Sequence, residues 1–92
     1  MISVHELLSL YDPCIIDIRN LENYNNNHLP GAINISYNDL LIDPSKHLNK
    51  KDKYYIYCKK GITSARLCQI LRKKGYNVYS VIGGYEAWLL GR

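Results

Sequence analysis

Apolar and polar residues follow one another along the chain in short blocks, most of which have the length and spacing of one strand or one helix. Four blocks rich in Ile, Val and Tyr predict strands: CIIDI (14–18), AINI (32–35), YYIYC (54–58) and NVYSVI (77–82). CIIDI is continuous rather than alternating, which is typical of a strand buried on both faces of a parallel sheet.

Helices are predicted between these strands. The longest runs from Ile62 to Lys74, where apolar residues recur with helical spacing, and Gly75 follows at the position of a helix C-cap. Shorter helices are predicted after Ser3, Asn20, Ser36 and Gly84, and Ser3 and Ser36 each begin a capping pattern. Because strand and helix alternate, we expect an α/β fold with a central, mostly parallel sheet of four to five strands, flanked by helices on both faces.

Composition narrows the class of protein. The 92 residues are 47% apolar and 22% charged, which predicts one globular domain, 1–92. No apolar stretch approaches the roughly 18–20 residues that cross a bilayer, and no signal-peptide pattern follows Met1. We therefore expect no membrane association and a cytoplasmic location. The net charge of +4 is modest, and we expect no nucleic-acid partner.

The three cysteines, Cys14, Cys58 and Cys68, differ in their predicted surroundings. Their odd number and the lack of CxxC or Cys/His ligand spacing predict free thiols, with no structural zinc and no other cofactor. Cys14 lies in an apolar strand and Cys68 on the apolar side of a helix, so we expect both in the core. Cys58 ends a central strand, and ligand sites of parallel sheets lie at the carboxyl ends of strands.

The stretch CKKGIT (58–63) has the chemistry of a thiolate site for a small anion. A helix N-terminus lowers the pKa of a thiol and binds anions, because its backbone N–H groups are unpaired. Gly61 would let the loop turn its amides toward the sulfur, and Lys59 and Lys60 add positive charge. For the Thr63 and Ser64 hydroxyls, two interpretations stay open: hydrogen bonding to the sulfur, or capping of the helix.

Several motifs in order resemble the rhodanese family of sulfurtransferases, from about Cys14 to Trp88. They are IIDIR (15–19), Glu22, Tyr24, HLPGAINI (28–35), YCKKGITS (57–64) and GGYEAW (83–88). The resemblance implies a rhodanese-like fold and a catalytic Cys58 that carries sulfane sulfur as a persulfide from a donor to an acceptor, such as cyanide, a thiol or a protein.

The cysteine loop resembles the CRKGVT loop of thiosulfate sulfurtransferases. This likeness implies a small anionic donor such as thiosulfate, bound by residues of the loop: Lys59, Lys60, Gly61, Ile62, Thr63 and Ser64. Mercaptopyruvate-using relatives carry small uncharged residues after the cysteine, which this loop lacks. Lys59 stands where the family has arginine, so the charge is kept but the bidentate fork is lost.

Three further family positions are expected to support the loop rather than to react. Asp17 and Arg19 end a buried strand, and buried charges require partners, so we expect a pairing network. His28 is expected to be a hydrogen-bonded turn residue; Asn27 precedes it where the family usually has glycine.

Two other functions are alternatives to sulfur transfer from thiosulfate. A phosphatase or arsenate reductase of similar design needs an arginine six residues after the cysteine, but Ser64 stands there and Arg66 comes two residues later. A persulfide carrier or interaction module, which receives sulfur from a protein donor and turns over little thiosulfate, stays open as the alternative.

Overall fold

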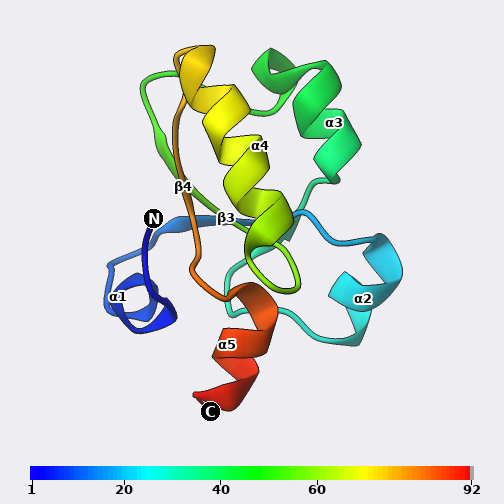
Figure 1. Ribbon diagram of the computed structural model, residues 1–92, viewed down its shortest axis with the longest axis vertical. Coiled ribbons are helices and arrows are strands. Elements are labelled where there is room, and N and C mark those ends of the chain that lie inside the picture. The colour runs from blue at the N-terminus through cyan, green and yellow to red at the C-terminus, as the bar shows by residue number, and fades with distance from the viewer. Residues whose placement is uncertain (92) are drawn as a thin grey trace.

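The computed structural model describes residues 1–91, which form a four-stranded sheet with helices on both faces (Figure 1). Every strand pair is parallel, and the order across the sheet is β2-β1-β3-β4. The strands are β1 (Cys14–Asp17), β2 (Ile33–Asn34), β3 (Lys53–Tyr57) and β4 (Asn77–Ser80). The helices are α1 (Val4–Leu8), α2 (Leu21–Asn26), α3 (Tyr37–Ile42), the 3-10 turn η1 (Pro44–Lys46), α4 (Ile62–Lys73) and α5 (Gly84–Leu90).

The register brings the carboxyl ends of β1 and β3 together at the centre of the sheet. Asp17 pairs with Tyr57, and the Ile18 N–H continues the ladder by donating to the Tyr57 carbonyl at 3.0 Å. Ile2 adds a single parallel bridge to Val81 beyond the end of β4. The predicted α/β class and parallel sheet are therefore confirmed, with four strands.

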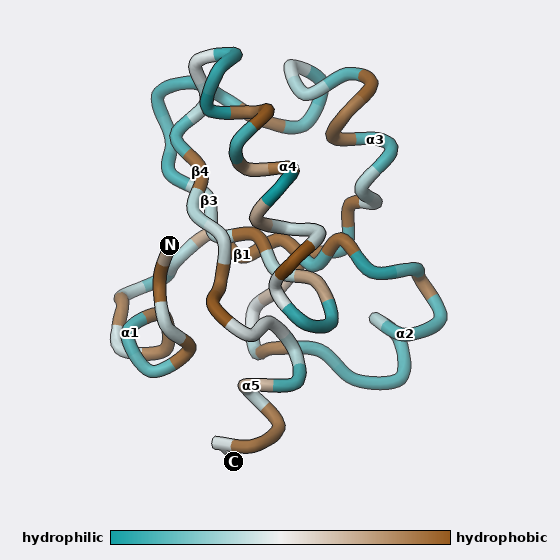
Figure 2. Tube along the Cα trace, in the orientation of Figure 1, coloured by the Kyte–Doolittle hydropathy of each residue, from teal (hydrophilic) through white to brown (hydrophobic). Residues whose placement is uncertain are grey.

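Successive residues of the strands pack into two hydrophobic cores, one on each face of the sheet. Ile16, Ile56 and Val78 face α3 and α4, where Leu67 and Leu71 complete a buried cluster. Successive side chains of a strand point to opposite faces, so Ile15, Tyr57 and Val81 face the other side. There they pack with Leu7 of α1 and with the partly buried Trp88 of α5. Figure 2 shows β1 as a brown, hydrophobic segment in the middle of the molecule, as a strand covered on both faces requires.

The capping patterns work as predicted. Ser3 Oγ accepts a hydrogen bond from the Glu6 N–H at 3.0 Å, and Ser36 Oγ accepts one from the Asp39 N–H at 3.1 Å. Each bond satisfies one of the free N–H groups of a helix N-terminus. Within residues 1–91, no helix is both long and apolar enough to cross a membrane.

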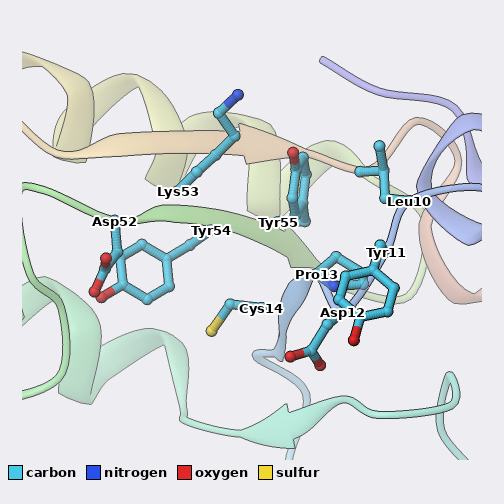
Figure 3. A pocket seen from close by; sticks show the side chains of 9 residues that line it. All are labelled: Leu10, Tyr11, Asp12, Pro13, Cys14, Asp52, Lys53, Tyr54 and Tyr55. Carbon is cyan, nitrogen blue, oxygen red and sulfur yellow. The ribbon is translucent and has the colours of Figure 1, made fainter.

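Cys14 does not lie in the core, contrary to the prediction. It is the first residue of β1 and is exposed, while the next residues, Ile15 and Ile16, are buried. An apolar run indicates a buried strand but not which of its ends the helices cover. At this end, a hollow of about 460 Å³ lies between the turn before β1 and the start of β3, and Cys14 lines it (Figure 3).

Asp17 is a fully buried charge with a complete set of partners. Its carboxylate accepts from Arg19 Nη2 at 2.7 Å and from the Tyr57 hydroxyl at 2.6 Å. The Tyr57 hydroxyl in turn accepts from the Leu29 N–H at 3.2 Å, and Arg19 Nη2 donates to the Asn27 carbonyl at 2.7 Å. The pair thus joins β1 and β3 to the segment 27–29.

We predict that Asp17→Asn lowers the free energy of unfolding by about 3–5 kcal/mol, because it leaves the Arg19 guanidinium buried without its counter-charge. Urea unfolding followed by circular dichroism measures this loss. Asp52→Asn is the matched control: Asp52 is exposed, and a change below about 0.5 kcal/mol is expected there. Equal losses in the two variants would contradict a structural role for the buried pair.

Candidate active site

Cys58 lies directly after β3 and before α4, at the carboxyl end of the sheet. The residue is 8% exposed and lines a hollow of about 270 Å³ together with the loop residues Lys59, Lys60, Ile62 and Thr63. The sulfur is therefore shielded from most of the solvent but still reachable from one side.

The sulfur is surrounded by hydrogen-bond donors of the loop. The Gly61 N–H donates to Sγ at 3.1 Å and the Ser64 N–H at 3.3 Å, and Ser64 Oγ lies 3.4 Å from Sγ. Gly61 is the N-cap of the twelve-residue α4, so the sulfur also lies at the positive end of a helix dipole. Of the two interpretations of the hydroxyls, Ser64 contacts the sulfur; Thr63 is exposed and its hydroxyl makes no hydrogen bond within residues 1–91.

These donors decide the charge state of the thiol. Burial by itself raises the pKa of Cys58, since it disfavours the charged form. The hydrogen bonds from Ser64, and from the N–H groups of Gly61 and Lys60, act in the opposite direction and win, so the pKa of Cys58 lies below its ordinary value. The site is thus built to hold a negatively charged sulfur.

The start of α5 holds the loop in this shape. The Tyr85 N–H donates to the Cys58 carbonyl at 2.9 Å, and the Glu86 N–H donates to the Lys59 carbonyl at 3.0 Å. The C=O and N–H of a trans peptide point in opposite directions, so holding the Lys59 carbonyl turns the Lys60 N–H toward the sulfur. α5 thereby fixes the first two peptide units of the loop, and the Gly61 and Ser64 N–H groups that follow also donate to the sulfur.

Glycine is required at two places in this contact. Gly61 has φ +94°, and a Cβ there would lie 2.9 Å from the Gly83 nitrogen. A Cβ on Gly84 would collide with the Cys58 carbonyl oxygen itself. No larger residue could let α5 approach the loop this closely.

Lys59 and Lys60 are exposed beside the hollow, and neither makes an ion pair within the described part of the chain. Ile62 is also exposed, at 61%. The entrance to the sulfur therefore combines two unpaired positive charges with one apolar side chain.

Of the three expected support residues, Asp17 and Arg19 connect to the loop and His28 does not. The Arg19 guanidinium stacks on the Tyr85 ring at 3.9 Å, and Tyr85 supplies the N–H that holds Cys58, so the Asp17 pair reaches the loop through α5. His28 lies elsewhere: its Nδ1 is 2.8 Å from the Tyr24 carbonyl, and its ring stacks on the Tyr24 ring at 3.9 Å. Its hydrogen bonds are with Tyr24 of α2 and with Asn27 at the end of that helix, and not with the sulfur.

Ser80 is a residue near the site that the sequence analysis did not single out. It is buried at the end of β4, and its Oγ lies 2.8 Å from Ser64 Oγ. The signal was available in the strand pattern, because Ser80 follows Val78 at a spacing of two and so occupies a core position with a polar side chain.

The larger hollow beside Cys14 is not the reactive site, although a thiol lines it. Burial raises the pKa of Cys14, and the charges of Asp52 and Asp12 raise it further, so this thiol is protonated at neutral pH. Figure 3 shows that the hollow is formed around the amino ends of β1 and β3, the opposite end of the sheet from Cys58.

The reactive cysteine lies on the loop between a central strand of a parallel sheet and a helix N-terminus. This arrangement defines a class of α/β domains that use a cysteine thiolate to react with anions. The comparison with known families is specific within this class: the chain belongs to the family described as the rhodanese-like domain, whose model matches residues 3–90.

Individual relatives support sulfur transfer as the class of reaction. The chain is 34% identical to a thiosulfate sulfurtransferase, GlpE, of Coxiella burnetii over 84 residues, which cover 90% of this chain and 78% of that protein. It is 31% identical to a putative sulfur carrier protein, YrkF, of Bacillus subtilis, over 80% of this chain and 40% of that one. A crystal structure of a rhodanese-related protein from Thermoplasma volcanium superposes with a TM-score of 0.87 at 25% identity, covering 98% of this chain and 90% of the other.

We predict that Gly84→Ala damages both stability and the reactive sulfur, whereas Gly31→Ala affects stability alone. Both glycines have positive φ, which costs alanine about 1–2 kcal/mol. A Cβ on Gly31 would meet nothing within 4 Å, but on Gly84 it would meet the Cys58 carbonyl and add about 1–3 kcal/mol. Urea unfolding and the rate of Cys58 alkylation measure the two effects; slowed alkylation in both variants, or in neither, would count against the contact.

We predict that Cys58 reacts with iodoacetamide at lower pH than Cys14 does. The thiolate is the reactive form, so the rate falls only when the pH drops below the pKa of each thiol. Because the pKa of Cys58 is lowered and that of Cys14 is raised, the midpoint of Cys58 should lie below that of Cys14. Mass spectrometry of the two peptides separates the rates in one experiment. Coincident midpoints would show that the loop does not stabilise the thiolate.

Proposed function

We propose that the protein is a thiosulfate sulfurtransferase in which Cys58 carries the sulfur. The observation that carries this proposal is the Cys58 sulfur itself, which accepts two backbone N–H bonds next to two unpaired lysines. Such a site favours a sulfur anion before, during and after the reaction with a doubly charged donor.

The first half-reaction transfers the outer sulfur of thiosulfate. The donor approaches Lys59 and Lys60 by charge attraction, and the Cys58 thiolate attacks the outer sulfur. One S–S bond forms, the S–S bond of thiosulfate breaks, and sulfite leaves with the electron pair. The product is a Cys58 persulfide whose terminal sulfur carries the negative charge.

The second half-reaction returns Cys58 to the thiolate. A nucleophile attacks the terminal sulfur, and the Cys58 sulfur leaves with the electrons of the broken bond. Cyanide would yield thiocyanate, and a thiolate would yield a new persulfide. Neither half-reaction needs a separate base. The Cys58 thiolate attacks in the first and an anionic acceptor attacks in the second, so no proton is transferred.

A persulfide carrier with little thiosulfate turnover is the second candidate. The exposed Ile62 beside Lys59 and Lys60 favours it, because an apolar side chain at the entrance contributes nothing to binding an inorganic anion but suits a protein surface. In that case the donor would be another protein's persulfide, and the acceptor a thiol or a protein.

Steady-state thiocyanate formation from thiosulfate and cyanide tests the first candidate. We expect the double variant Lys59→Ala/Lys60→Ala to raise KM for thiosulfate by about tenfold with a smaller change in kcat, since each exposed charge pair contributes up to about 1 kcal/mol. Lys51→Ala is the matched control, because Lys51 is an exposed lysine in the loop before β3. Mercaptopyruvate should be the poorer donor.

Two results would contradict these assignments. Equal KM values in the lysine variant and in Lys51→Ala would remove thiosulfate as the donor recognised by the loop. Full activity in Cys58→Ser would exclude both candidates, since each requires a persulfide at this sulfur. A wild-type protein that turns over no thiosulfate but accepts sulfur from a low-molecular-weight persulfide would favour the carrier.

A further inference from the structure

A pair of buried serine hydroxyls lies against the Cys58 sulfur. Ser64 of α4 and Ser80 of β4 are 0% and 2% exposed, and their Oγ atoms are 2.8 Å apart. Ser64 Oγ is also 3.4 Å from Cys58 Sγ and 3.3 Å from the Gly61 carbonyl oxygen. Among the hydrogen bonds of residues 1–91, Ser80 reaches the sulfur only through Ser64.

Packing alone does not explain this pair. Ser80 occupies the same face of β4 as Val78, and Ser64 points into the core from the face of α4 that carries Leu67 and Leu71. Replacing two mutually bonded buried polar groups by apolar groups of similar shape is often neutral or stabilising. Small apolar residues would therefore stabilise the fold equally well. The position of the two hydroxyls beside the reactive sulfur indicates a role in its chemistry.

The role of the serine pair follows from the number of protons that the two hydroxyls and the thiol can donate. Each hydroxyl has one proton to donate and two lone pairs. When Cys58 is a thiol, its S–H donates to Ser64 Oγ, and the Ser64 proton is free to go to the Gly61 carbonyl or to Ser80. When Cys58 is a thiolate, the sulfur can only accept, so the Ser64 proton must turn toward it and leave its other acceptor.

We propose that Ser80 is a positioning residue for the Cys58 thiolate: its hydroxyl donates to Ser64 Oγ, so the single Ser64 proton cannot go to Ser80 and is left for the sulfur, whose negative charge attracts it more strongly than the Gly61 carbonyl does. In this arrangement Ser80 donates a hydrogen bond to Ser64, and Ser64 donates one to the negatively charged sulfur. Consecutive hydrogen bonds with the same donor direction strengthen one another. The assignment deepens the proposed function and rests on it in one respect, that the Cys58 thiolate is the working form.

The hydrogen bonds from Ser80 through Ser64 to the sulfur affect the rates of the two half-reactions in opposite directions. A stabilised thiolate is a weaker nucleophile toward thiosulfate but a better leaving group when cyanide attacks the persulfide. Losing the Ser80 hydroxyl should therefore leave persulfide formation at high pH as fast as in the wild type or faster, and slow persulfide discharge. Damage to the fold would slow both steps.

The test is the pH dependence of Cys58 alkylation by iodoacetamide, which needs no sulfur donor. We expect Ser80→Ala to raise the midpoint by about half to one pH unit, the effect of weakening one hydrogen bond to a charged group. Ser80→Thr keeps the hydroxyl and should return the midpoint to the wild-type value. An unchanged midpoint in Ser80→Ala, or a raised one in Ser80→Thr, would overturn the proposal.

A double-mutant cycle separates action through Ser64 from any direct effect. Ser64→Ala should raise the midpoint by itself, and adding Ser80→Ala to it should change nothing further, because the hydroxyl that Ser80 directs is already gone. Additive shifts would overturn the proposal. The other titratable groups of the elements packed around the sulfur stay the same in every variant: Lys59, Lys60, Cys68, Glu86 and the group of Asp17, Arg19 and Tyr57.

Single-turnover rates then connect the pair with sulfur transfer. At a pH above all midpoints, Ser80→Ala should attack thiosulfate at least as fast as the wild type and lose its sulfur to cyanide more slowly, by about threefold for each unit by which the midpoint rises. Equal slowing of both steps would contradict a positioning role. If thiosulfate fails as a donor for the wild type, the alkylation cycle still tests the serine pair, so the two proposals fail separately.

Discussion

The carbonyl oxygens of Cys58 and Lys59 accept hydrogen bonds from the first turn of α5, and the rest of the site depends on these two bonds. Since the two ends of a peptide unit point in opposite directions, a carbonyl held outward turns its N–H inward. Holding the Lys59 carbonyl thereby turns the Lys60 N–H toward the sulfur, where the Gly61 and Ser64 N–H groups also donate, and together these bonds outweigh the cost of burying its charge. Gly61 and Gly84 are needed because any Cβ would push α5 and the loop apart.

The buried pair of Asp17 and Arg19 extends this constraint through the molecule. Burying two charges is expensive, and such a pair is kept only where its remaining hydrogen-bonding capacity is filled. Here Tyr57, at the end of β3, fills one side, and the Arg19 guanidinium lies over the Tyr85 ring. The strand before Cys58 and the helix that holds its carbonyl therefore share one fixed group of side chains.

The sequence predicts much of this arrangement, including a pairing network for Asp17 and Arg19, but not the contact between the two buried serines. Strand and helix positions followed from apolar periodicity, and the prominence of Cys58 followed from its place between a strand and a helix, because these depend on local patterns. The prediction that Cys14 is buried was wrong because it depends on distant parts of the chain: whether a strand end is covered is decided by helices far away in the sequence. The strand spacing indicates a core position for Ser80, but its contact with Ser64 does not follow from the sequence, since Ser64 lies sixteen residues earlier and meets it only in the folded protein.

The proposed sulfur transfer requires that Cys58 is held as a thiolate and accepts one sulfur atom from a small anionic donor. Incubation with thiosulfate, followed by intact-mass measurement under non-reducing conditions, tests it directly. We expect a mass gain of one sulfur atom in the wild type and in Cys14→Ser, removal of that sulfur by cyanide, and no gain in Cys58→Ser. A wild type that gains no sulfur, or a gain that persists in Cys58→Ser, would contradict it.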